Sequence, residues 1–410
     1  MKTPPSLKRE AWLNDGALRR VFDALERAGG EARVAGGAVR NALMGEAVDE
    51  IDIATTLTPE QIMKAGVGAR LGVHPTGIDH GTITVVVGGK PFEVTTLRVD
   101  VETFGRRARV AFTDDWQADA LRRDFTMNAL YCSRDGEIFD PAKGYDDILR
   151  KRVRFVGSPS ERIKEDALRI LRFFRFHARY GAGAPDAEGF AACVRHRAKL
   201  KGLSGERVRQ EMFKLLEAKR AADTTKLMVA RLVLKVLFVP AANLTPLARM
   251  AKVDEALGLK ADALLRLALV ANDAGGLRER LRLTNAETRR LAAVAHHAGP
   301  TPRLRDRERR VVLYHLGQEA WRDTVRLAWA KSKDPVGSQK WRDLLAFTDH
   351  WSIPRFPLTG KDLLARGVEE GPVLGKELGR LEDWWIASDF MADKEDLLRR
   401  LNWITGNDGA

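Results

Sequence analysis

Hydrophobic and polar positions follow two different patterns along this 410-residue chain. Up to about residue 150, short apolar runs alternate with glycine and polar turns, which is typical of strands mixed with short helices. The segments ARVA and EIDIATT predict strands, AVRNALMG a short helix between them, and TPEQIMKAG a helix with a Thr58–Gln61 capping box. GTITVVVGGKPFEVTTLR predicts a hairpin turning at GGK, and we expect VDVETFGRRARVAFTDD to be a polar loop.

From about Arg150 onward the spacing of apolar residues is helical. SERIKEDALRILRFFRFHARYG predicts one long helix with Ser160 as its N-cap, and SGERVRQEMFKLLEA predicts another. Beyond Lys219 strand signals disappear, and seven of the nine tryptophans lie after residue 300, where we expect them to fill the core between helices. The predicted fold class is therefore α+β, with a mixed sheet and helices first and an all-helical remainder.

Composition narrows the class of protein further. The formal net charge is +13, which fits a polyanionic partner and fits equally well a soluble protein rich in arginine. No apolar run is long enough to span a membrane, and the start of the chain lacks the apolar core of a secretory signal. Cys132 and Cys193 form neither a metal motif nor a disulfide framework, so we expect buried thiols in a reducing cytoplasm.

A glycine pair and two nearby carboxylates are the first candidates for chemistry. Gly36 and Gly37 let backbone N–H groups approach a phosphate, and Arg40, one helical turn on, can add a charged fork. Glu50 and Asp52 are two apart on a predicted strand, so both should lie on one face. On their own they suit a solvent-exposed strand; beside the glycine turn and the arginine they favour a pair of Mg²⁺ ions that also touch a triphosphate.

Two further groups of polar residues accompany apolar segments. Glu93, polar within PFEVTTLR, is either a third carboxylate near the metals or an outward-facing side chain. In RRDFTMNAL, Arg123 can hold a phosphate, and Asp124 and Asn128 can bond a ribose hydroxyl. Surface charge at the start of a helix is the simpler explanation for this second group when it is considered alone.

The segment EDALRILRFFRF places Asp166 and Arg169 three residues apart, with Arg172 and Arg175 on the same ridge. A solvated helix face is the default explanation, but the phenylalanines around it indicate partial burial. A carboxylate and a guanidinium together match the exocyclic amine and the ring nitrogen of cytosine or adenine, whereas uracil and guanine present the reverse pattern. Such a pair can therefore select C and A without a template.

Five segments in this order, GGAVRNALMG…EID, EVTTLR, RRDFTMNAL, FDPAKGYDDI and EDALRILRFFRF, resemble the class II tRNA nucleotidyltransferases and related poly(A) polymerases of the polymerase β-like superfamily. The resemblance is dense from about Val34 to Lys219 and looser beyond. It implies a nucleotidyltransferase head over residues 1–150, a helical neck for base recognition over 151–220, and a helical body and tail that bind tRNA over 221–410.

The resemblance also implies an activity and its residues. CTP and ATP would be used to add C, C and A to the 3′ end of tRNA, with two-metal transfer and release of pyrophosphate, and no membrane or protein partner is predicted. The implied sites are Mg²⁺ ligation by Glu50 and Asp52 with Glu93 in support, phosphate or sugar contacts from Gly37, Arg40 and Arg123, and base recognition by Asp166 and Arg169 with Arg172 and Arg175 alongside.

Three positions depart from the family pattern. Glu50 and Asn41 stand where the family usually has Asp, and Val99 stands where related sequences often carry an acid, in a region linked to the change from C to A addition. The alternatives are a poly(A) polymerase, a specialist that adds only CC or only A, and a catalytically inactive RNA-binding protein. The intact carboxylate trio argues against the last of these.

Overall fold

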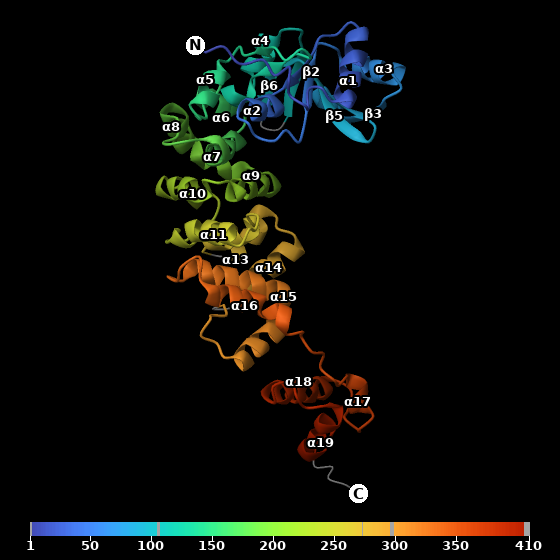
Figure 1. Ribbon diagram of the computed structural model, residues 1–410, viewed down its shortest axis with the longest axis vertical. Coiled ribbons are helices and arrows are strands. Elements are labelled where there is room, and N and C mark those ends of the chain that lie inside the picture. Colours follow the sequence, from blue (N-terminus) through green and yellow to red (C-terminus); the bar gives the residue numbers. More distant parts are fainter. Residues whose placement is uncertain (1, 105–106, 273, 296–298, 406–410) are drawn as a thin grey trace. The chain divides into compact units, whose positions relative to one another are not determined.

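The computed structural model describes residues 2–104, 107–272, 274–295 and 299–405. The chain divides into two compact units, one of residues 1–240 with 279–282 and one of residues 241–278 with 283–410. The first unit contains the sheets and helices α1 to α10, and the second is built of helices throughout its described part (Figure 1). This confirms the predicted α+β class, whereas the three-part division at residues 150 and 220 stays a prediction.

The first unit is built on a seven-stranded mixed sheet with the order β3-β4-β5-β2-β1-β8-β9. Only β2 and β5 pair in parallel; the other neighbours are antiparallel. The strands of this sheet are β1 (Ala32–Ala35), β2 (Asp52–Thr55), β3 (Gly72–Gly77), β4 (Thr82–Val87), β5 (Lys90–Thr96), β8 (Tyr131–Cys132) and β9 (Ile138–Phe139).

Most of the strands and helices expected before residue 100 are present. The ARVA strand and the hairpin of β4 and β5 are confirmed, and the Thr58–Gln61 capping box begins helix α3 (Pro59–Gly68) as predicted. The expected polar loop after Leu97 is wrong, because β6 (Arg98–Phe104) and β7 (Arg107–Phe112) pair as an antiparallel two-stranded sheet. Polar residues at every second position suit a strand with one solvated face, and in the sequence such a strand resembles a polar loop.

The helices of the first unit cover the sheet and then continue beyond it. Helices α1 and α3 pack against each other beside β3 and β4. The α-helices of this unit are α1 (Gly16–Arg27), α2 (Gly37–Leu43), α3, α4 (Trp116–Leu121), α5 (Gly144–Leu149), α6 (Pro159–Glu165), α7 (Leu168–Tyr180), α8 (Ala187–His196), α9 (Gly205–Glu217) and α10 (Ala221–Ala230).

The long helix predicted over residues 160–181 is instead two helices, α6 and α7. Helix α6 begins after Ser158 with Pro159 in its first turn, so the expected N-cap at Ser160 is wrong. The break falls at Asp166, which has extended backbone angles and whose carboxylate accepts a hydrogen bond from the N–H of Leu168 at 3.0 Å. Aspartate side chains can replace backbone carbonyls as hydrogen-bond acceptors and so interrupt a helix. Here the Asp166 carboxylate accepts the hydrogen bond from the first backbone N–H of α7.

Aromatic side chains attach helix α7 to the sheet region. Phe155 and Phe173 stack with ring centroids 5.5 Å apart, and Phe125, which follows the RRD segment, packs 5.0 Å from Phe176. Phe125, Phe155 and Phe173 are fully buried and Phe176 almost so. Because buried aromatic pairs of this kind bring large apolar areas together, α7 is held in a defined position relative to the residues near Arg123.

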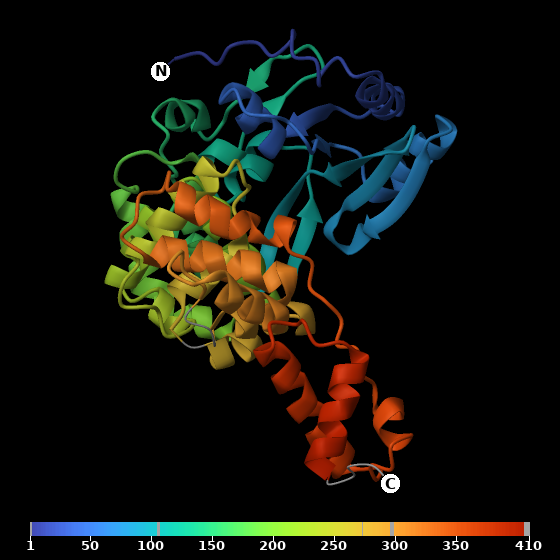
Figure 2. The same ribbon diagram turned by 60° about the horizontal axis from the view of Figure 1, so that its bottom comes forward.

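The second unit is helical, as the sequence pattern predicts. Trp321, Trp329 and Trp341 are buried in one core cluster, and Trp385 is buried in another, formed by Leu358 and residues of α17, α18 and α19. The ribbons of these three helices, coloured red, lie close together (Figure 2). The helices are α11 (Thr245–Ala256), α12 (Ala263–Val270), α13 (Ala274–Leu281), α14 (Asn285–Ala295), α15 (Asp306–Lys331, kinked at Gly317), α16 (Gln339–His350), α17 (Gly360–Leu364), α18 (Pro372–Ala387) and α19 (Lys394–Thr405).

Both cysteines are buried and free, as expected from the sequence. Among the described helices, none combines the length and the apolar composition needed to cross a membrane.

Candidate active site

Two carboxylates on neighbouring strands form the centre of the candidate site. Asp52 is the first residue of β2 and lies opposite Glu93 of β5 in parallel register. Residues paired across adjacent strands point to the same face, with the strands about 4.8 Å apart. Glu93 is exposed between the buried Phe92 and Val94, so this face is the solvated one.

The electrostatic environment of Asp52 disfavours its negative charge. Asp52 is solvent-accessible, yet the protein around it removes enough water that desolvation is the largest cause of its raised pKa. The carboxylates of Glu93 and Glu50 act in the same direction, Arg123 acts against them, and the pKa of Asp52 is about 6. A bound cation would relieve this repulsion, so the surroundings of Asp52 suit a metal ion.

Glu50 does not lie on a strand, which corrects the expected arrangement of Glu50 and Asp52. Strand β2 begins only at Asp52, which pairs with Ala35 of β1. Directly after Ala35 the chain turns at Gly36 into α2, so β1 offers no partner to the residues before Asp52. Glu50 is in the preceding coil and is exposed. It nevertheless lines the same two pockets as Asp52, so the structure brings the two carboxylates into one site by a different route.

The glycine turn and Arg40 lie beside these carboxylates. Gly36 has φ of 67°, and a Cβ there would lie 3.2 Å from Nη1 of Arg123. Arg40 is 7 % exposed and donates hydrogen bonds to Asn128 Oδ1, to the Tyr180 hydroxyl at 2.8 Å and to Asn41 Oδ1 at 2.8 Å. Asn41, one of the departures from the family pattern, therefore orients Arg40 with a neutral oxygen where the family usually has a carboxylate.

Arg123 is held by groups that were not identified from the sequence. Its Nη2 lies 3.1 Å from Oδ2 of Asp119, and its Nε donates to the hydroxyl of Tyr131 at 3.1 Å. Asp119 is 1 % exposed, and although burial raises its pKa, Arg123 and Arg122 bring the balance below the usual value. A buried carboxylate therefore fixes the direction of Arg123, which lines the pocket and whose Nη1 also donates to the carbonyl of Asn128 at 3.4 Å.

Asp124, Asn128 and Arg172 form one network between the sheet region and helix α7. Asn128 donates to Asp124 Oδ1 at 3.0 Å, while Arg172 pairs with Asp124 Oδ2 through both Nε and Nη2. Burial raises the pKa of Asp124, but Arg172 and these hydrogen bonds outweigh it and bring the pKa to about 2. Because Asn128 also accepts from Arg40, the structure joins Arg40 to Arg172 through three side-chain contacts.

Asp166 and Arg169 line one pocket but do not lie on one helix face. Asp166 is at the break after α6, whereas Arg169 is in the first turn of α7, which corrects the predicted shared ridge. Oδ2 of Asp166 accepts from Arg207 of α9 at 2.6 Å. Arg169 donates to Glu165 and, at 3.0 Å, to the carbonyl of Arg162. Arg207 was missed because nothing in the sequence near it indicates which side chain it would contact.

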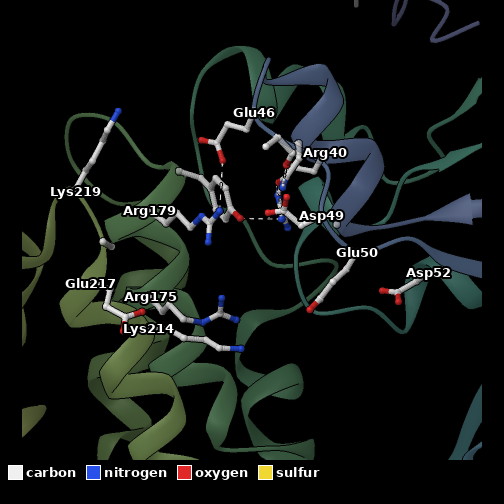
Figure 3. A pocket seen from close by; sticks show the side chains of 15 residues that line it. Arg40, Glu46, Asp49, Glu50, Asp52, Arg175, Arg179, Lys214, Glu217 and Lys219 are labelled. Carbon is white, nitrogen blue, oxygen red and sulfur yellow. Dashed lines mark hydrogen bonds and ion pairs between the residues drawn. The ribbon is translucent and has the colours of Figure 1, made fainter. Parts of the chain in front are cut away.

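Two pockets meet at the carboxylates. The Asp166 pocket, of about 550 Å³, is lined by Arg122, Arg123, Asp124, Asn128, Asp166, Leu168, Arg169, Arg172, Phe176 and Arg207, together with four residues shared with its neighbour. The Lys214 pocket, of about 780 Å³, takes its other lining from residues 41–49 and from helices α7 and α9 (Figure 3). The four shared residues are Gly37, Arg40, Glu50 and Asp52.

Arg175 belongs to the Lys214 pocket and not to the pocket of Asp166 and Arg169. Its Nε lies 2.5 Å from Oε2 of Glu211, and its guanidinium lies over the ring of Phe176. Among the described residues, no group of three or more His, Cys, Asp or Glu side chains converges as a metal site.

A mixed sheet that presents paired carboxylates beside a glycine turn, followed by helices that carry a second set of polar side chains, defines a nucleotidyltransferase head with a helical extension. Sequence profiles agree: residues 32–154 match the Poly A polymerase head domain, and residues 185–244 match the probable RNA and SrmB- binding site of polymerase A.

Similar proteins identify the family. The chain is 35% identical over 389 residues to CCA tRNA nucleotidyltransferase 1, mitochondrial, of Danio rerio, covering 91% of this chain and 87% of the relative. The human protein of the same name is 34% identical, with 93% and 88% covered. The crystal structure of the Bacillus stearothermophilus CCA-adding enzyme in complex with CTP has 27% identity and a TM-score of 0.78, with 96% of this chain and 100% of that chain covered. The chain belongs to the CCA tRNA nucleotidyltransferase family and is a nucleotidyltransferase.

Proposed function

We propose that this protein adds C, C and A to the 3′ end of tRNA without a template, using CTP and ATP and releasing pyrophosphate. The observation that carries the proposal is the placement of Asp52, which lines the Asp166 pocket, opposite Glu93 of the neighbouring strand. Relatives named for this activity cover nearly the whole chain, which supports it further.

The incoming nucleotide occupies the Asp166 pocket. Arg123 contacts its phosphates, since it lines this pocket and its Nη1, which donates to the carbonyl of Asn128 at 3.4 Å, lies beside the glycine turn. Asp124 and Asn128 position the ribose. Both residues line the pocket, and their mutual hydrogen bond keeps the side chains from rotating away.

Base selection rests on Asp166 and Arg169. A carboxylate can accept about four hydrogen bonds, so Asp166 can take the exocyclic amine of C or A in addition to its bonds from Leu168 and Arg207. Arg169 retains donors for the ring nitrogen. A U or G in this pocket would leave buried polar groups unpaired, a penalty of about 1–3 kcal/mol for each lost bidentate match.

Mg²⁺ is the proposed cofactor, held by Asp52 and Glu50 with Glu93 in support. Two observations indicate that these residues suit Mg²⁺. The carboxylates repel one another, which a cation would relieve, and Mg²⁺ in proteins is usually bound by one or two carboxylates together with substrate phosphates and water. When bound, it supplies positive charge to the triphosphate and lowers the pKa of the attacking hydroxyl. Transfer then forms a bond from the RNA 3′-oxygen to the α-phosphorus and breaks the bond to pyrophosphate, and the hydroxyl proton passes to solvent.

For its location we propose the reducing cytoplasm. The support is that both cysteines are free thiols, which suits a compartment in which thiols stay reduced. The vertebrate relatives carry the word mitochondrial in their names. Fractionation of cells producing a C-terminally tagged chain tests this, and recovery in an organelle fraction contradicts it.

Single-nucleotide incubations test the activity. We expect labelled CTP alone to extend tRNA lacking its last three nucleotides by two residues, and labelled ATP alone to extend tRNA ending in CC by one. Tailing of unstructured RNA by ATP alone would indicate a poly(A) polymerase. C addition without A would indicate a CC specialist, A addition without C an A specialist, and no incorporation an RNA-binding protein without activity.

A further inference from the structure

Arg40 is a buried cation that no carboxylate neutralises. Its side chain is almost fully buried, and Arg40 lines both of the pockets described above. Over the part of the chain that the structure describes, Arg40 forms no ion pair, whereas Arg123 and Arg172, which line the same pocket, each pair with an aspartate. Burial lowers the pKa of Arg40 below its usual value, as expected for a cation that is not neutralised. Such a guanidinium favours an anionic ligand.

The hydrogen-bond partners of Arg40 are neutral oxygens. Asn41 Oδ1 accepts from Nε at 3.1 Å and from Nη2 at 2.8 Å, Asn128 Oδ1 accepts from Nη1, and the Tyr180 hydroxyl accepts from Nη2 at 2.8 Å. These bonds engage four of the five N–H groups of the guanidinium. One N–H on Nη1 has no partner among the described residues, so it remains for a ligand.

Tyr180 is the partner of Arg40 that helix α7 supplies. It is the last residue of α7, whereas Asn41 follows Arg40 directly on α2. The ring of Tyr180 also contacts Arg40, with the guanidinium carbon 4.2 Å from the ring centroid, and it packs 5.4 Å from the ring of Phe176. The ring therefore attracts the cation, while the hydroxyl fixes the direction of Nη2.

We propose that Tyr180 is a positioning residue for nucleotide binding, whose hydroxyl and ring hold Arg40 so that the remaining N–H on Nη1 meets a phosphate of the nucleotide in the Asp166 pocket. This inference rests on the proposed function, because it takes that pocket as the nucleotide site. CTP and ATP carry the same triphosphate, so Tyr180 acts on both equally and takes no part in choosing the base. The proposed base-reading residues, Asp166 and Arg169, lie at the opposite end of α7.

Tyr180→Phe tests the hydroxyl, because the ring and its packing remain. We expect the dissociation constants for CTP and for ATP, measured by titration with Mg²⁺ in the absence of tRNA, to rise by the same factor of about five. The ratio of the UTP and CTP dissociation constants should stay within about twofold of the wild-type ratio, since the triphosphate is common to all three nucleotides. A variant that merely shifts α7 would change this ratio, because Arg169 lies on the same helix.

Tyr314→Phe is the matched control. It also removes a tyrosine hydroxyl that is hydrogen-bonded to a charged side chain, in this case Glu382, but Tyr314 lines neither pocket. We expect its dissociation constants for CTP, ATP and UTP to match those of the wild type.

A second substitution tests whether Tyr180 acts through Arg40. Asn41→Asp places a carboxylate at the two nitrogens that Asn41 now holds, and it removes an exposed hydrogen bond from Asn41 to the carbonyl of Ala47. Charge-assisted bonds of this bidentate kind are about twice as strong as neutral ones. The direction of the guanidinium then depends less on the Tyr180 hydroxyl, so adding Tyr180→Phe to Asn41→Asp should raise the dissociation constant for CTP by less than about twofold.

The outcomes separate this inference from the proposed function. An unchanged affinity for CTP in Tyr180→Phe, a loss for CTP but not for ATP, or a changed preference for CTP over UTP overturns the inference and leaves CCA addition intact. An equally large effect of Tyr180→Phe in the Asn41→Asp background does the same. A wild type that binds CTP but does not add C, C and A overturns the proposed function alone, and a wild type that binds no CTP overturns both.

Discussion

Oδ2 of Asp166 accepts a hydrogen bond from Nη2 of Arg207 at 2.6 Å, across the gap between the break after α6 and helix α9. The second oxygen of Asp166 accepts from the Leu168 N–H, so two donors fix the plane of the carboxylate. Arg207 itself lines the pocket that Asp166 lines. A side chain distant in sequence thus determines how the proposed base-reading carboxylate faces its ligand.

Replacing either partner of this pair should loosen base selection. We expect Asp166→Ala to lower the preference for CTP over UTP by about tenfold or more, since one bidentate match accounts for about 1–3 kcal/mol. Arg207→Ala should reduce the same ratio by a smaller factor, and Arg207→Lys should restore part of it. The measurement is kcat/KM for CTP and UTP, and an unchanged ratio in Asp166→Ala removes this residue from base recognition.

Gly36→Ala should weaken nucleotide binding through a steric effect on Arg123. A Cβ at residue 36 would meet Arg123 Nη1 at 3.2 Å and the Asn128 carbonyl oxygen at 3.4 Å. Gly45 is a matched control, because it has a similar φ of 68° and a Cβ added there would have no neighbouring atom within 4 Å. Each alanine should cost about 1 kcal/mol of stability. Only Gly36→Ala should also raise the KM for CTP, and an equal rise in both variants would contradict this account of Arg123.

Asp52→Asn should abolish nucleotide transfer without abolishing tRNA binding. The substitution keeps the shape of the side chain but removes its charge, and we expect kcat to fall by about 10³-fold or more. Glu50→Asp is the conservative control, and it should retain activity within about tenfold because a carboxylate remains. Gel-shift titration with tRNA accompanies the kinetics; loss of tRNA binding together with activity in Asp52→Asn would argue against a role confined to the metal and the nucleotide.

His177 should make folding stability depend on pH below neutrality. Its side chain is buried, and Arg220 donates to its Nε2 at 3.4 Å, which only a neutral imidazole can accept. Burial, and then the charge of Arg220, lower the pKa of His177 to about 4 from its usual 6.5. The unfolded chain therefore binds the proton more readily between pH 6.5 and 4, so stability is fully present above this window and falls by up to about 1.4 kcal/mol per pH unit within it.

Urea unfolding at several pH values measures this contribution. The slope of unfolding free energy against pH should be shallower in His177→Gln than in the wild type between pH 6.5 and 5, whatever the absolute stability of the variant. Equal slopes would show that His177 does not resist protonation in the folded protein.

The parts of the fold that could be predicted from the sequence are those that depend on residues close together in the chain. The β4–β5 hairpin and the α3 capping box depend on neighbouring residues, and both were predictable from their turn and cap chemistry. The break at Asp166 was not, because the apolar spacing remains helical across it and only the carboxylate's bond to Leu168 interrupts the backbone. The sequence pattern placed Glu50 on the strand with Asp52, but β2 begins at Asp52 because its pairing with β1 ends at Ala35.

The same distinction applies to the candidate site. Asp52, Glu93 and Arg123 stand out in the sequence because each is polar within or beside an apolar segment. Arg207 lies on an ordinary amphipathic helix, and the packing of α9 against α7 brings it to Asp166. Long-range contacts of this kind leave no local pattern, so only the structure could identify them.

Sequencing the 3′ ends of the products tests the central claim most directly. Purified protein is incubated with tRNA lacking its last three nucleotides, Mg²⁺ and all four ribonucleoside triphosphates at equal concentration. The account predicts that nearly every extended molecule ends in CCA and that extension stops there. Ends that carry runs of A, incorporated U or G, or C without a final A would contradict it.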